Sequence, residues 1–230
     1  MSISKSSIVS VTAIVLAGLS GSGAAQAGTV TATFTYDHLS NIDITASGGI
    51  YNGGVNTVSF HWTRTDAPGA GVDSTVPLTF DTYCVDLSQT VSPSNAYTFD
   101  AIPIASAGYT PTQMDLIRTL WATSKSTVTD ATQAAAFQAA LWELVYDTNN
   151  DITTGTFKLN SPNSVITAAT AMLTTALAMR GEVQLPSLVV LRSDRAQDQI
   201  CEAPNVPTPG ATALAAFGLL LAARRTRKQA

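Results

Sequence analysis

The stretch Asp130–Asp147, DATQAAAFQAALWELVYD, decides the fold class, because its apolar residues recur at helical spacing in a chain whose first part is patterned as β. Five apolar side chains share one face of the predicted helix: Ala134, Phe137, Leu141, Trp142 and Val145. Gln138 lies near the middle of this face, whereas Glu143 points the opposite way and is expected in solvent. A buried amide costs roughly 1–3 kcal/mol unless it is hydrogen-bonded. An ordinary structural glutamine would meet this need by bonding to a neighbouring backbone.

Two further helices are expected around this one. Thr110 and Pro111 form a plausible N-cap and first-residue pair for a helix that precedes it. A third helix is expected over about Pro162–Arg180, with Gly181 as its C-terminal stop.

The segments on either side of the helices alternate with the period of two that is typical of strands. The expected strands are Thr29–Tyr36, Ile42–Ala46, Val55–Thr63, Val76–Leu87, Tyr97–Ile102 and Val183–Leu191. Strands, then helices, then a strand indicate one α+β domain. We therefore expect an antiparallel β-sheet or sandwich with a three-helix insertion over residues 28–195.

Residues 1–27 follow the pattern of a secretory signal peptide. Lys5 supplies a positive start, Ile8–Leu19 is apolar, and Ala25-Gln26-Ala27 is a small-x-small cleavage site. The mature protein is expected to begin at Gly28 and to lie outside the cytoplasm.

The C-terminal segment, residues 206–230, has three parts. Val206-Pro-Thr-Pro-Gly210 is followed by the apolar run Ala211–Ala223 and by a basic cluster that ends at Lys228. The apolar run is shorter than the roughly 20 residues that span a bilayer comfortably, and the basic cluster acts as a cytoplasmic stop. This suits a segment that is held in the inner membrane transiently and then cut. Residues 196–205 are expected to be a linker.

The C-terminal segment resembles the PEP-CTERM sorting signal, although Thr208 stands where Glu is usual. The resemblance implies processing by an exosortase and a final location at the cell envelope or surface, or outside the cell. Between Gly28 and Asn205 there are seven basic and sixteen acidic side chains, a net charge of −9. Such an acidic body argues against nucleic acid as a partner.

Cys84 and Gln138 are the candidate reactive pair. Cys84 lies in the predicted strand segment Thr82–Asp86, TYCVD. A cysteine thiolate near a glutamine side chain can expel ammonia and form an internal thioester, provided that water is excluded. Four residues are expected to shield the bond: Tyr83, Asp86, Phe137 and Trp142.

The two motifs, Tyr83-Cys84-Val85-Asp86 and Gln138-Ala-Ala-Leu141-Trp142-Glu143, resemble those of the Cys–Gln thioester domains of bacterial surface proteins. The resemblance covers roughly residues 78–192. It implies a surface adhesin or matrix protein that links covalently to amines of other proteins or of an amino-polysaccharide. The interval of 54 residues between cysteine and glutamine is compact for the family, and Phe137 stands where Thr often precedes the Gln.

The alternative is a non-reactive structural envelope or matrix protein with a Cys84–Cys201 disulfide, Cys201 lying in the expected linker. An enzyme is not expected, because His38 and His61 fall in Thr-rich strands and no nucleophile–base set is evident. No cofactor or metal site is expected either. The segment Asp147–Asp151 has some calcium-loop character but is better explained as a polar turn, since Ile152 stands where such a loop needs Gly.

Overall fold

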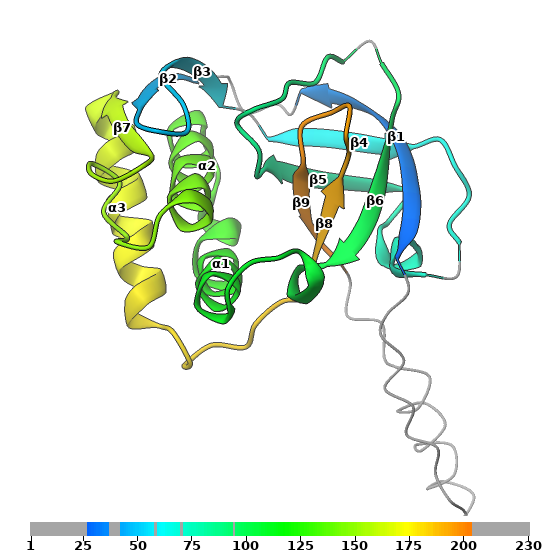
Figure 1. Ribbon diagram of the computed structural model, residues 1–230. Helices are drawn as coiled ribbons and strands as arrows, with labels where there is room; N and C mark the ends of the chain where they lie inside the picture. Colours follow the sequence, from blue (N-terminus) through cyan, green and yellow to red (C-terminus); the bar gives the residue numbers. More distant parts are fainter. Residues whose placement is uncertain (1–26, 37–41, 58, 70, 94, 204–230) are drawn as a thin grey trace, which may run out of the picture.

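The computed structural model describes residues 27–36, 42–57, 59–69, 71–93 and 95–203, apart from the side chain of Tyr36 (Figure 1). Residues 1–26 of the expected signal peptide and the C-terminal sorting segment lie outside these ranges, as does His38. Figure 1 shows a strand-rich half beside a half made of helices and a small sheet. Within the described ranges, no helix is both long and apolar enough to cross a membrane.

The strand-rich half is a closed barrel in the order β1-β4-β5-β9-β8-β6, with every neighbouring pair antiparallel. Its strands are β1 (Gly28–Tyr36), β4 (Phe60–Arg64), β5 (Thr79–Cys84), β6 (Tyr97–Pro103), β8 (Leu188–Arg192) and β9 (Gln199–Glu202). Aromatic rings fill it: the ring of Trp62 contacts those of Phe34, Phe60, Phe80, Tyr97 and Phe99. The barrel core also holds one polar chain, in which the Trp62 indole donates to Thr82 and Thr82 donates to Gln199.

The helices of the other, helical half are inserted between β6 and β8, whereas two strands of its small sheet come between β1 and β4 in the chain. Its helices are α1 (Pro111–Ser124), α2 (Ala131–Tyr146) and α3 (Asn163–Ala178). A second sheet, in the order β3-β2-β7, packs against α2 and α3; its strands are β2 (Ile42–Ser47), β3 (Gly53–Thr57) and β7 (Lys158–Ser161). Three short 3-10 helices complete the described elements: η1 (Val72–Thr75), η2 (Ile104–Ser106) and η3 (Lys125–Thr127).

The helix boundaries follow local chemistry. Thr110 and Gln113 form a reciprocal capping box at the start of α1, and the Asp130 carboxylate accepts the Gln133 N–H at the start of α2. The expected N-cap of α1 and its first-residue proline are therefore confirmed. The third helix ends at Ala178 with Met179 as its C-cap, so Gly181, with φ +82°, lies two residues beyond the C-cap of the helix for which it was expected to be the stop.

The α+β class, the antiparallel strands and the three-helix insertion are confirmed, but the strands close into a barrel where a sheet or sandwich was expected. The expected strand Val55–Thr63 was wrong as a single element. It is divided between β3 in the small sheet and β4 in the barrel. Periodicity did not reveal the division, because more buried and more exposed residues alternate in both β3 and β4, and the two strands differ only in the strands with which they pair.

The expected linker at residues 196–205 was also wrong for its described part. Gln199–Glu202 forms β9, which bridges β5 and β8 and thereby closes the barrel. Ala196, Ile200 and Cys201 are fully buried. A strand of four residues is too short to display a clear period, so the sequence pattern did not reveal it.

Candidate functional site: a buried cysteine–glutamine pair

The side chain of Gln138 bonds to the backbone of Cys84. The Cys84 N–H donates to Gln138 Oε1 at 2.9 Å, and Gln138 Nε2 donates to the Cys84 carbonyl at 2.7 Å. Gln138 lies in the middle of α2 and Cys84 is the last residue of β5, so the two bonds join the helical half to the barrel. Both residues are at most 2% exposed. The structure thus brings together the two residues that the sequence singled out.

The Cys84 thiol is enclosed by the chain that follows it. Its S–H donates to the Asp86 carbonyl at 2.8 Å, and the Asp86 N–H donates back to the sulfur at 3.3 Å. Burial raises the pKa of the thiol well above its ordinary value, whereas the Asp86 backbone and the Trp142 side chain act to lower that pKa. The thiol is therefore neutral and buried, and the Asp86 N–H donates to its sulfur.

Three of the four expected shielding residues are deeply buried. Tyr83 and Phe137 have ring centroids 4.5 Å apart, and both rings contact that of Trp121. Trp142 packs on Phe157 with centroids 5.9 Å apart. Asp86 is half-buried, and its carboxylate accepts the N–H and O–H of Ser88. Its backbone, more than its carboxylate, covers the sulfur.

Tyr146 fastens the segment that encloses the thiol, residues 85–89, which we call the strap. The Tyr146 hydroxyl accepts the Leu87 N–H at 2.9 Å and donates to the Val85 carbonyl at 3.3 Å. Burial raises the pKa of Tyr146 above its ordinary value, so its proton is retained for the second bond. The sequence motifs did not single out Tyr146. Its position eight residues after Gln138, near the same helix face, was the available signal.

The Cys84–Cys201 disulfide is not formed: both cysteines are free and buried. Cys84 pairs with Gln199 across the β5–β9 ladder, and Cys201 lies two residues farther along β9. Such a diagonal offset places the Cα atoms about 8 Å apart, beyond the roughly 7 Å that a disulfide spans. Burial raises the pKa of the Cys201 thiol to about 12, so this cysteine is a core residue without evident reactivity.

Glu143 does not point to solvent as expected. It is fully buried, and among the described residues neither carboxylate oxygen has a partner in hydrogen-bonding geometry. Burial and, to a smaller extent, the nearby carboxylate of Asp147 together raise its pKa to about 8. The expectation was wrong because α2 is covered on nearly every side by the barrel, α1, α3 and the small sheet, so it has no solvent face at this position.

The loop after α2 uses its polar side chains to hold itself. The Asp147 carboxylate accepts the N–H groups of Thr156 and Phe157, and the Asp151 carboxylate accepts the N–H and the O–H of Thr153. Asn149 accepts the Asp151 N–H. No group of three or more acidic, histidine or cysteine side chains in the described ranges is placed to hold a metal ion. The arrangement is that of a self-bonded polar turn.

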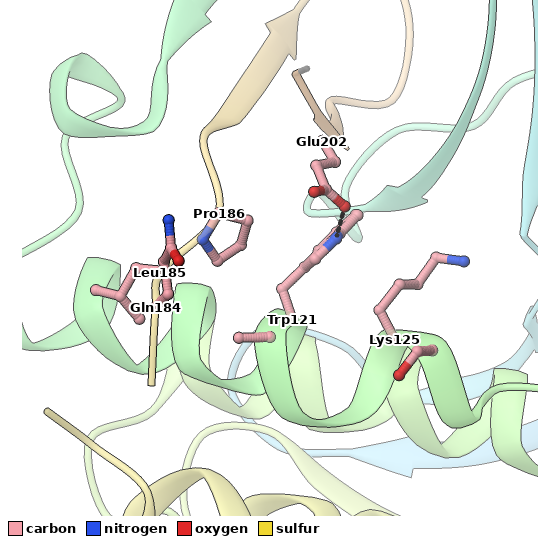
Figure 2. A pocket seen from close by; sticks show the side chains of 8 residues that line it. Trp121, Lys125, Gln184, Leu185, Pro186 and Glu202 are labelled. Atoms are coloured by element: carbon pink, nitrogen blue, oxygen red, sulfur yellow. Dashed lines mark hydrogen bonds between the residues drawn. The ribbon is translucent and has the colours of Figure 1, made fainter. Parts of the chain in front are cut away.

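A surface pocket of about 490 Å³ lies where α1 meets the segment before β8 (Figure 2). Trp121 forms one wall and donates its indole N–H to Glu202 at 3.0 Å, while Lys125 lies one turn farther along. Gln184, Leu185 and Pro186 line the other side. Trp121 also contacts the rings of Tyr83 and Phe137, which directly precede Cys84 and Gln138 in the chain.

The fold and the site together define an α+β barrel protein with a buried cysteine–glutamine pair at the junction of its two halves. Comparison with known proteins found no matching family model, no matching curated protein and no matching solved structure. The geometry of the Cys84–Gln138 pair is therefore the guide to function.

Proposed function

We propose that this protein is an exported surface or matrix protein that forms a Cys84–Gln138 thioester and links covalently to amines. One observation carries the proposal: the reactive groups are held together by the two hydrogen bonds between the Gln138 amide and the Cys84 backbone. These bonds fix the amide beside the residue whose sulfur would attack it. The proposal is also supported by the burial of both residues, because a thioester survives only where water is excluded.

The backbone supplies one group that thioester formation needs. Attack of sulfur on the Gln138 carbonyl carbon places negative charge on Oε1, and the Cys84 N–H already donates to that atom at 2.9 Å. A donor in place before the reaction stabilises the tetrahedral intermediate. The thiol proton leaves with the amide nitrogen as ammonia. An outside primary amine then opens the ester, forms an amide with Gln138 and restores the thiol.

The location and partners are further parts of the proposal. The signal-peptide pattern at residues 1–27 and the PEP-CTERM-like segment at 206–230 support export, transient anchoring in the inner membrane and processing by an exosortase. Amines of surface proteins or of amino-polysaccharides are the expected targets. N-terminal sequencing of envelope material should give Gly28, and a chain that starts at Met1 would contradict export.

Intact mass spectrometry tests the reactive bond. The mature protein should weigh one ammonia less than its sequence, and methylamine should add to Gln138 and release one thiol. Cys84→Ala should abolish both effects. Cys201→Ala is the matched control and should leave both unchanged. A full-mass wild-type protein that does not react with methylamine would end the proposal.

A second candidate is a non-reactive structural protein of the same fold. It is favoured by the pairing of both polar atoms of the Gln138 amide, Oε1 and Nε2, which by itself explains why a glutamine is buried there. In that case Gln138 only joins α2 to β5, and the mass equals that of the sequence. The disulfide once expected for this alternative does not belong to it, since both cysteines are free.

A further inference from the structure

The indole N–H of Trp142 is a buried donor without a partner. Trp142 is 1% exposed, and among the described residues its Nε1 has no acceptor in hydrogen-bonding geometry. The other two indoles of the chain are paired: Trp62 donates to Thr82 at 2.8 Å and Trp121 donates to Glu202 at 3.0 Å. Buried donors are rarely left unpaired, so this exception needs an explanation.

The position of Trp142 indicates which group the N–H serves. It follows Gln138 by four residues on α2 and so lies on the same helix face, one turn farther along. One side of its ring is packed on Phe157. Its neighbours on this face both bond to the chain around the sulfur: Gln138, one turn before it, bonds to the Cys84 backbone, and Tyr146, one turn after it, bonds to the strap. Trp142 therefore lies against the segment that encloses the Cys84 thiol.

Sulfur accepts hydrogen bonds very differently in its different states. A thiol or thioester sulfur is a weak acceptor, whereas a thiolate is a strong one. An N–H beside such a sulfur therefore forms only a weak hydrogen bond to the thiol or the thioester, and a strong one once the sulfur carries negative charge. An interaction that strengthens only as charge develops accelerates the chemical step.

We propose that the Trp142 indole N–H stabilises the Cys84 thiolate, both as the nucleophile that attacks Gln138 and as the leaving group when an amine opens the ester. This role rests on the proposed thioester. In formation, the S–Cδ bond forms, the Cδ–Nε2 bond breaks and the thiol proton leaves with ammonia. In opening, the amine nitrogen bonds to Cδ, the S–Cδ bond breaks and a proton of the amine returns to sulfur. Trp142 keeps its own proton in both steps.

Trp142→Phe keeps an aromatic ring and removes the donor. Ammonia loss after refolding and opening by methylamine, both followed by intact mass, should each slow by about tenfold. This is less than the 10²–10³-fold effect of an oxyanion donor, because sulfur is the weaker acceptor. Trp62→Phe is the matched control, since it removes an indole N–H from the barrel core and should leave both rates within about twofold.

A second measurement does not depend on the thioester. In a Gln138→Met, Cys201→Ala background, Cys84 is the remaining thiol and cannot form the ester. Its alkylation by iodoacetamide at a fixed alkaline pH reports the thiolate fraction. Adding Trp142→Phe should slow alkylation about tenfold, because the thiolate loses its donor. If Trp142 only shields the thiol, the same change admits the reagent and alkylation becomes faster.

The outcomes are separable. A wild-type protein that never loses ammonia would refute the proposed function and, with it, the role of Trp142 in the reaction. Ammonia loss at an unchanged rate in Trp142→Phe, or faster alkylation in the Gln138→Met background, would refute the role of Trp142 alone. Slower reaction in both arms, with Trp62→Phe unchanged, would support it.

Discussion

Gln138 bonds to Cys84 as a neighbouring β-strand would. Its amide accepts the Cys84 N–H and donates to the Cys84 carbonyl. On its other side, Cys84 pairs with Gln199 of β9 in the barrel. The pairing of β5 with β4 ends at Thr82. Beyond that residue β4 no longer supplies backbone partners to β5, and the Gln138 side chain takes over this role at Cys84. One side chain thereby completes the sheet edge and joins the two halves of the protein.

Removing this amide should destabilise the domain whether or not the ester forms. Gln138→Ala in a Cys84→Ala background should lower the free energy of unfolding by about 2–4 kcal/mol, because two buried hydrogen bonds are lost and the backbone groups at position 84 are left unpaired. Denaturant unfolding measures the change. Gln133→Ala, whose amide bonds to exposed Thr129, should cost less than about 1 kcal/mol. Equal losses for the two variants would contradict the joining role.

Tyr146→Phe should loosen the strap while leaving the rest of the fold in place. The Leu87 N–H loses its acceptor, so hydrogen exchange at Leu87 should accelerate by about tenfold or more. If the thioester forms, its hydrolysis should accelerate as well, because water reaches the sulfur more often. Tyr97→Phe, which removes a hydroxyl bonded to Ser92, is the control and should leave exchange at Leu87 unchanged. Unaltered exchange in Tyr146→Phe would show that the strap is held by other contacts.

Glu143 should make stability depend on pH. The carboxyl ionises near pH 4.5 in the unfolded chain but keeps its proton up to about pH 8 when folded. Between these values unfolding releases a proton, so stability should fall as pH rises from about 4.5 to 8 and then level off. Glu143→Gln should remove this slope and be the more stable form above pH 8. Glu182→Gln alters an exposed carboxylate and should leave the slope intact. A slope retained in Glu143→Gln would assign it to another group.

Gly155→Ala should destabilise the turn that follows α2. Gly155 has φ +100°, and an added Cβ would lie 2.6 Å from a carboxylate oxygen of Asp147, which binds the Thr156 and Phe157 amides. Left-handed strain and the clash should together cost about 2–4 kcal/mol. Gly181→Ala isolates the strain, because φ is +82° there but nothing lies within 4 Å of the added atom. That variant should cost about 1 kcal/mol in thermal or denaturant unfolding. Equal costs would show that the Asp147 contact is relieved by a small shift.

The sequence by itself determined the local elements. Periodicity located α1, α2, α3 and most strands, and the capping residues Thr110 and Asp130 set two helix starts, because these signals depend only on near neighbours. The apolar face around Gln138 was also legible, since a buried amide in such a face needs a partner. Motif resemblance predicted Cys84 as the partner of Gln138, and the structure places these two residues together.

Only the tertiary structure decided which segments pair and which faces lose their solvent. Closure of the barrel depends on β9, a four-residue strand whose stability comes from β5 and β8. Glu143 is buried because the other elements surround α2, and Tyr146 reaches the strap because α2 crosses the end of β5. These features arise from contacts between residues distant in the chain. Periodicity reports which side of an element is apolar, but it carries no information about what covers the other side.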